Sequence, residues 1–167
     1  MANDFTYDPS LEDQEIPASF ENATEGTTAA VLVDIVPLGF FEQENDKGVK
    51  KQVFKINAVF QIEEENQKGY RFTVRRRYSL SLNEKAAFRP VYEALVGRKV
   101  TTDEENGKTK LKVSDLINLI GRSVMIKIVR SQDGKYDNVE TVMALPKGMA
   151  PVGARGYTRV KDREKAA

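Results

Sequence analysis

The chain of 167 residues contains no cysteine and no histidine. The lack of cysteine excludes disulfides, zinc–thiolate sites and thiol nucleophiles. The lack of histidine removes the commonest general base and the commonest transition-metal ligand of proteins. An enzyme that works with carboxylates and a metal ion remains open. The composition nevertheless favours a binding protein over an enzyme, and it indicates no cofactor.

The sequence also lacks a long apolar run and a basic N-terminus. No stretch approaches the roughly 18 consecutive apolar residues that a membrane-spanning helix needs. The N-terminal segment is acidic where a secretory signal peptide would be basic. We therefore expect a cytoplasmic protein with no membrane partner.

Lysine and arginine are absent from residues 1–46, which carry eleven acidic side chains. All 26 basic residues and the other 14 acidic residues follow, so residues 47–167 have a net charge of +12 that the total of +1 hides. A basic body of this size attracts polyanions, and such asymmetry points to nucleic acid or to a charged tail. The alternative is that the acidic end only aids solubility.

The domain organisation follows from this charge pattern and from the spacing of apolar residues. Residues 1–26 are polar, lack apolar periodicity and are interpreted as a flexible acidic leader. Residues 27–146 are expected to form one domain. Residues 147–167, which are basic and punctuated by glycine and proline, are expected to form a flexible tail.

Hydrophobic periodicity predicts strands over residues 29–38, 49–62, 70–82, 123–130 and 136–145, and helices over 84–96 and 113–120. Loops are expected at 39–48 and 99–111, and Asp133-Gly134 indicates a tight hairpin. Pro90 should kink the first helix or begin a second one. Arg76 interrupts the apolar face of the third strand, which predicts a β-bulge or a strand end there.

Three strands, a helical insert and two further strands form the chain order of an OB-fold. We therefore expect a mainly β protein with a five-stranded Greek-key barrel. The face across the second and third strands of such barrels commonly binds oligonucleotides.

The candidate binding residues lie on that face and in the loops beside it. The outward positions of the second and third strands are basic, and no acidic residue lies between Gly48 and Ile62 or between Gly69 and Leu82. Arginine suits phosphate because its planar fork donates two parallel hydrogen bonds. Tyr78 occupies a position of the third strand that faces the expected core, but it would reach the surface if Arg76 marks a bulge. The predicted basic residues are Lys51, Lys55, Arg71, Arg75, Arg77, Lys127, Arg130 and Lys135, and the predicted aromatic residues are Phe40, Phe41, Tyr78 and Tyr136.

Two carboxylate runs, at residues 63–65 and 103–105, offer the main argument for catalysis. A two-metal nuclease needs carboxylates that converge from separate elements. Both runs fall in predicted turns or loops, so we interpret them as solvated.

The chain resembles the OB-fold single-stranded DNA-binding proteins encoded by bacteriophages and prophages. The resemblance is carried by RRRYSLSLNEKAAFRPVYEALVGR (75–98), LINLIGRSVMIKIV (116–129) and DGKYDNVETVMALPKGM (133–149). It implies sequence-tolerant binding of single-stranded DNA in phage replication or recombination, without catalysis. It also implies that Arg75, Arg77 and Tyr78 lie near the bound strand, that Tyr136 and Asn138 lie beside the hairpin, and that Gly121 and residues 146–148 are structural.

One feature departs from that family, whose members often end in an acidic tail. This chain begins acidic and ends basic. The leader could recruit replication or recombination proteins, or it could screen the basic groove until DNA displaces it. The remaining alternatives are a protein-interaction module that captures a host or replisome factor, an RNA-binding OB domain and a carboxylate–metal nuclease. Assembly into a homo-oligomer is left open.

Overall fold

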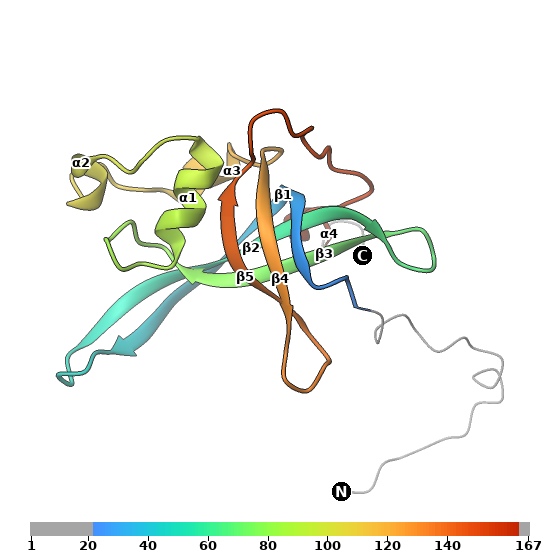
Figure 1. The fold of residues 1–167 in the computed structure, drawn as a ribbon. Coiled ribbons are helices and arrows are strands. Elements are labelled where there is room, and N and C mark those ends of the chain that lie inside the picture. The colour runs from blue at the N-terminus through green and yellow to red at the C-terminus, as the bar shows by residue number, and fades with distance from the viewer. Residues whose placement is uncertain (1–21, 164–167) are drawn as a thin grey trace, which may run out of the picture.

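A computed structural model describes residues 22–163 (Figure 1). This part of the chain is mainly β, with a five-stranded antiparallel sheet and short helices. The strands are β1 (Gly26–Glu44), β2 (Lys50–Glu65), β3 (Arg71–Ser79), β4 (Ser123–Arg130) and β5 (Asp137–Ala144). The helices are α1 (Phe88–Val96), α2 (Thr102–Glu105), α3 (Val113–Ile117) and α4 (Val160–Arg163).

The sheet has the order β3-β2-β1-β4-β5, and it curves so that the two edge strands, β3 and β5, come into contact. In the described part of the chain no backbone ladder joins these edges, so the sheet is not closed by strand pairing. The expected five strands are present, and the helical insert lies between β3 and β4 as predicted.

The hydrogen bonds between β3 and β5 come from the side chain of Arg76, beside core residues that the two strands share. Its Nη1 donates hydrogen bonds to the carbonyl oxygens of Val139 and Glu140, both at 3.1 Å. Its guanidinium carbon lies 5.0 Å from the ring centroid of Tyr78. Arg76 pairs in register with Ala58, so the predicted bulge or strand end is wrong. Arg76 can occupy an inward-facing position of β3 because two carbonyl groups of β5 accept hydrogen bonds from its guanidinium.

The core lies between the inner face of the sheet and the helical insert. The alternation predicted for β2 is confirmed, because Ile56, Ala58 and Phe60 are fully buried. Phe88 of α1 is also fully buried and lies 5.5 Å from Tyr78, measured between ring centroids. Helix α1 packs on β4 and β5, and so covers the side of the sheet where the strands do not pair.

The first strand is much longer than predicted. β1 continues past Pro37 to Glu44 and pairs with β2 along its whole outer half, so the expected loop at 39–48 is wrong. Register shifts between Leu32 and Asp34 and between Pro37 and Gly39 bend the strand, and bulges are where a strand tolerates proline. The result is a two-stranded arm, residues 39–55, that projects from the sheet at the lower left of Figure 1.

Helix α1 begins at Phe88, later than predicted. Pro90 therefore lies in the first turn, where its missing N–H costs nothing. The Ser81 hydroxyl accepts a hydrogen bond from the Asn83 amide and does not cap a helix. The helix ends at Gly97 as predicted, and the φ angle of +78° there favours glycine.

The polar segment 99–111 contains a helix that the sequence pattern did not predict. Thr101 and Glu104 form a reciprocal capping box at the start of α2. Glu104 also accepts hydrogen bonds from Arg98 at 2.8 Å and from the Tyr92 hydroxyl at 2.9 Å. Chiefly through Arg98 and then the Thr101 amide, these donors lower the pKa of Glu104 to about 2. This carboxylate is structural, not merely solvated as predicted.

The second helix of the insert, α3, is shorter than predicted. It ends at Ile117, and its capping residue is Lys112. Gly121, which follows a short turn, donates its amide hydrogen to the Leu32 carbonyl at 2.8 Å. This bond fixes the insert to β1.

The two Arg76 hydrogen bonds give a stability prediction. Arg76→Gln removes the cation and leaves two carbonyl groups without their donor, so we expect the free energy of unfolding to fall by roughly 1–3 kcal/mol in urea titrations. Arg77→Gln is the matched control, because Arg77 is exposed on the other face; its effect should stay within about 0.5 kcal/mol. Equal effects of the two substitutions would contradict the role given to Arg76.

Candidate nucleic-acid interface

The outer face of β3 carries a row of polar and basic side chains. Arg71, Thr73, Arg75 and Arg77 alternate with inward-facing residues along this strand. Arg75 and Arg77 are exposed, and within residues 22–163 neither has an ion-pair or side-chain hydrogen-bond partner. Two adjacent unpaired guanidinium groups are therefore free to meet an anion.

The arm extends this outer face on one side. Ser79 pairs with Lys55, so Lys55 follows Arg77 diagonally on the same surface. The Lys55 ammonium lies 5.5 Å from the ring centroid of Phe41, which is 38% exposed. The arm therefore adds one cation and one aromatic ring to the surface of β3.

Other arm residues do not join that surface. Phe40 is 69% exposed but lies on the opposite face of the arm, in edge contact with Phe54 at 5.0 Å. Phe40 and Phe41 lie in a strand, not in the predicted loop, and adjacent strand residues point to opposite faces. Lys51 lies eight residues along β2 from Val59, the partner of Arg75. That separation corresponds to about 26 Å, so Lys51 and Arg75 do not share one compact site.

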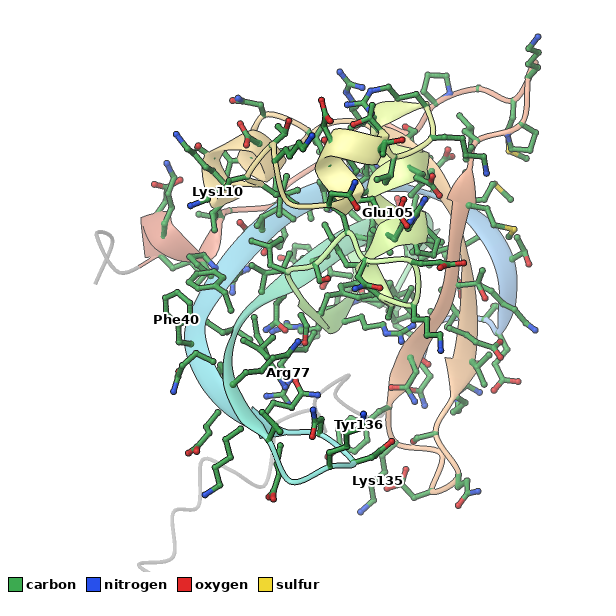
Figure 2. All side chains as sticks on the ribbon, turned by 90° about the vertical axis from the view of Figure 1, so that its left-hand side faces the viewer. Phe40, Arg77, Glu105, Lys110, Lys135 and Tyr136 are labelled. Atoms are coloured by element: carbon green, nitrogen blue, oxygen red, sulfur yellow. The ribbon has the colours of Figure 1, made fainter. Side chains whose placement is uncertain are left out.

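A groove runs between β3 and the β4–β5 hairpin. It encloses about 630 Å³ and is lined by residues 22, 72–75 and 135–138. Tyr136, in the hairpin turn, is 65% exposed. In Figure 2, Arg77 lies near the middle of the view, with Tyr136 and Lys135 below it. We call this cavity the hairpin groove, and it brings together Arg75, Lys135 and Tyr136, three of the candidate binding residues.

The turn that presents Tyr136 is held by local hydrogen bonds. The predicted hairpin is confirmed, with the Ser131 amide donating to the Tyr136 carbonyl at 2.8 Å. The Ser131 hydroxyl accepts from the Tyr136 amide and donates to Asp133, which keeps the pKa of the Asp133 carboxyl below its usual value. Gly134 has a φ of +75°, as the tight turn requires.

Several predicted site residues are engaged elsewhere. Tyr78 is only 3% exposed and packs in the core, where burial raises its pKa to about 12. Since Arg76 forms no bulge, Tyr78 does not reach the surface, and its predicted contact with a bound strand is wrong. Lys127 lies outside the hairpin groove and pairs with Glu140 at 3.1 Å. Arg130 pairs with Asp137 at 3.5 Å and donates to the Ala23 carbonyl.

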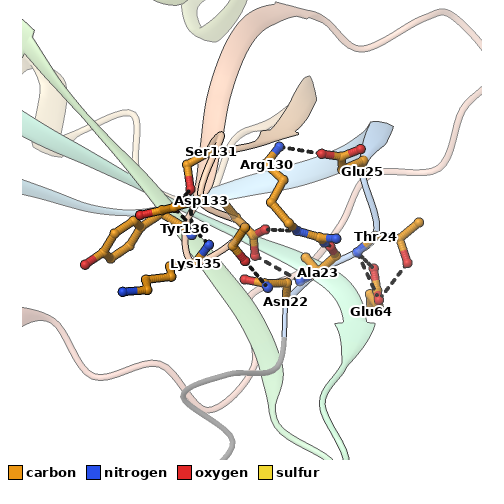
Figure 3. Close-up of polar contacts among 12 residues, drawn as sticks. Asn22, Ala23, Thr24, Glu25, Glu64, Arg130, Ser131, Asp133, Lys135 and Tyr136 are labelled. Atoms are coloured by element: carbon orange, nitrogen blue, oxygen red, sulfur yellow. Dashed lines mark hydrogen bonds and ion pairs between the residues drawn. The ribbon is translucent and has the colours of Figure 1, made fainter.

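The last residues of the predicted leader are part of the fold (Figure 3). Ala23 is fully buried, and its amide donates to Asp137 at 2.9 Å. Thr24 donates to Glu64, and Glu25 accepts from the Arg130 amide at 2.7 Å. Asn22 donates to the Gly134 carbonyl at 3.0 Å and lines the hairpin groove. The ordered part therefore begins before Thr27; the rest of the leader, residues 1–21, lies outside the described residues.

The C-terminal segment, residues 150–163, is attached to the outer face of β1 and β2. Val152 is buried against Val31, Val33 and Val59. Gln61 exchanges two hydrogen bonds with the backbone of Arg155, at 2.7 and 2.8 Å. The prediction of a flexible tail is therefore wrong for this segment. The segment covers part of the outer face of β2, which the sequence pattern had predicted to be exposed.

A buried carboxylate fixes the end of this segment. Asp34 is 1% exposed and accepts hydrogen bonds from the Val160 amide at 2.8 Å, the Tyr157 hydroxyl at 3.0 Å and Arg159 Nε at 3.0 Å. Burial opposes the charged form, but these donors hold the pKa of the Asp34 carboxyl below its usual value. The sequence contains a signal for this buried carboxylate, because Asp34 interrupts the apolar run 31–36. No site was predicted there from the sequence.

The outer face of β3 and the hairpin groove form the main candidate site. Within residues 22–163 no three Asp or Glu residues are grouped so that they could hold a metal ion. No helix in that range is long and apolar enough to cross a membrane. No known protein-family model and no curated protein matches the sequence. A functional assignment therefore depends on the geometry described above.

The Asp34 site predicts how the C-terminal segment is held. Asp34→Asn removes the charge that Arg159 and the Val160 amide stabilise, so the free energy of unfolding should fall by roughly 1–3 kcal/mol. Trypsin should also cut faster after Arg159 and Lys161 in the native protein. Asp162→Asn, an exposed change in the same segment, is the control. Unchanged cleavage and stability in Asp34→Asn would show that Asp34 does not fix the segment.

Proposed function

We propose that this protein binds single-stranded DNA without sequence preference, along the outer face of β3 and in the hairpin groove. The observation that carries the proposal is the juxtaposition of unpaired arginines with an exposed aromatic ring. Arg75 and Lys135 line one groove with Tyr136, and Arg77 continues the row. Basic groups that track phosphates, together with rings on which bases stack, are the two requirements of sequence-tolerant single-strand binding.

The proposal includes an OB-fold-like barrel. Its support is the order of the elements, with the insert between β3 and β4, together with the pairing of β1 with both β2 and β4. The arm and the β4–β5 hairpin project from the lower side of the sheet in Figure 1. In OB-folds the corresponding two loops flank the oligonucleotide-binding face.

The physical consequence is a preference for unstacked bases and a strong dependence on salt. A base must leave its duplex stack to lie on the Tyr136 ring, so duplex DNA should bind weakly. Each phosphate that a lysine or arginine neutralises releases counterions, so affinity should fall as salt rises. We propose a non-enzymatic role in phage DNA replication or recombination, on the strength of the family resemblance, which covers about residues 29–149.

Fluorescence anisotropy with a labelled thymidine oligomer of about 30 nucleotides tests the function, because such a strand spans at least one site of roughly 4–16 nucleotides. Arg75→Ala combined with Lys135→Ala should weaken binding about tenfold or more. The double variant should also reduce the slope of log K against log salt by roughly 0.7 for each phosphate that is no longer neutralised. Lys51→Ala, remote from the groove, is the matched control and should change affinity little.

The outcomes separate the proposed function from its alternatives. Equal weakening by the double variant and by Lys51→Ala would mean that binding is not centred on the hairpin groove. Equal affinity for a uridine oligomer would favour an RNA-binding domain. A complete absence of oligonucleotide binding at low salt would contradict the proposal and favour a protein-interaction module.

The leader gives a separate prediction. Residues 1–21 contain six acidic side chains and no basic one, and Asn22, the next residue, lines the hairpin groove. Deleting residues 1–21, while keeping the buried Ala23, should raise affinity for single-stranded DNA, most at low salt, where charges are least screened. A full-length control with the six acids replaced by Asn and Gln should reproduce the gain. Unchanged affinity in both proteins would show that the leader does not screen the groove.

A further inference from the structure

A second cavity lies on the other side of β3, facing away from the hairpin. It encloses about 320 Å³ between the β2–β3 turn and the C-terminal segment, and it is lined by residues 61, 69–71, 73 and 155–157. Thr73 lines both this cavity and the hairpin groove. The two cavities are therefore neighbours, separated by the width of one strand. We call the second one the turn pocket.

The lining of the turn pocket combines aromatic rings with guanidinium groups. Tyr70 is 69% exposed, and among the described residues its hydrogen bonds, to Asn66, are made by its backbone alone. Tyr157 is half-buried, and its hydroxyl donates to Asp34, which fixes the orientation of its ring. The Tyr157 ring also has the guanidinium of Arg163 at 5.2 Å from its centroid. One ring is thus free to meet a ligand, and the other is held in place.

The residues that line the turn pocket include two arginines, Arg71 and Arg155, and no acidic side chain. Arg71 donates to the Gly153 carbonyl, but its Nε is buried and, within residues 22–163, has no hydrogen-bond partner. Arg155 pairs with Glu65 at the rim, which neutralises one cation. Within residues 22–163 Arg71 has no ion-pair partner, so no carboxylate neutralises its cation beside Tyr70. This arrangement suits an anion attached to a planar ring.

We infer that the turn pocket is a second nucleotide subsite, in which a base of a single strand stacks on Tyr70 and its phosphate meets Arg71. The inference rests on the proposed function, because it extends the strand from the hairpin groove across Thr73. Arg71, Thr73 and Arg75 are successive residues on one face of β3, so the two arginines lie about 13 Å apart along the strand. A short oligomer can occupy one cavity, and a longer one spans both.

The inference gives the C-terminal segment a part in binding. Residues 155–157 form one wall of the turn pocket, and they are held there by Gln61 and Asp34. Without this segment Tyr70 and Arg71 would lie on an open surface. The site would then consist of β3 with one cavity on each side, one built by the hairpin and the other by the C-terminal segment.

Tryptophan reporters test the inference directly, because the chain contains no tryptophan. Tyr70→Trp reports on the turn pocket and Tyr136→Trp on the hairpin groove. Phe40→Trp is the control, since Phe40 is as exposed as Tyr70 but lies on the far face of the arm. Each full-length variant is titrated with thymidine oligomers of about 2 and about 12 nucleotides, because a dinucleotide is too short to span the roughly 13 Å between the two arginines.

We expect the longer oligomer to quench the fluorescence of both the Tyr70→Trp and the Tyr136→Trp variants, and the fluorescence of the control to remain unchanged. Tyr70→Ala should weaken binding of the longer oligomer about fivefold or more, as expected when one base no longer stacks, with little effect on the shorter one. Thermal melting should be unaltered, because the Tyr70 side chain is exposed.

Two negative results have different meanings. Quenching of the position-136 reporter without any change at position 70 would overturn the turn pocket as a subsite and leave the proposed function standing. No quenching at either position, together with no anisotropy change for any oligomer, would contradict the proposed function itself and the inference with it.

Discussion

The architecture depends on one cation placed where a strand ladder is missing. Arg76 reaches from β3 to two carbonyl groups of β5, so the edges of the sheet meet through a side chain. This contact holds β3 beside the β4–β5 hairpin, and the hairpin groove exists only because the two lie together. A half-buried cation is tolerated when acceptors and ring faces compensate its lost hydration, and Arg76 has two carbonyl acceptors and the Tyr78 ring.

The two ends of the described chain lie on opposite sides of β3. Residues 22–25 attach beside the hairpin through Asp137 and Arg130, and the C-terminal segment attaches over the outer face of β1 and β2. Neither attachment uses a strand ladder, and a carboxylate takes part in each: Asp137 accepts from the Ala23 amide, and Asp34 accepts from Arg159. The C-terminal segment thereby covers part of β1 and β2, whereas Arg75 and Arg77 on β3 stay exposed.

Local patterns in the sequence predicted the features that local interactions determine. β4 has the predicted bounds, the Asp-Gly hairpin is confirmed, and the inward residues of β2 form the core. The errors concern residues whose partners are distant in sequence: Arg76 with β5, Asp34 with Arg159, and Ala23 with Asp137. The spacing of apolar residues carries no information about such distant pairs. The sequence pattern therefore wrongly predicted a bulge or strand end at Arg76 and a flexible tail over residues 150–163.

The bond between Asp34 and Arg159 also bears on how the protein is made. Its partners are 125 residues apart, so at about 5–20 residues per second the ribosome adds Arg159 about 6–25 s after Asp34. Throughout that interval the outer face of β1 and β2, with Val31, Val33 and Val59, lacks the segment that covers it. The domain thus completes its outer layer only after residues 152–160 have been synthesised, and a nascent chain that stalls before Val152 leaves an apolar strand surface open to self-association.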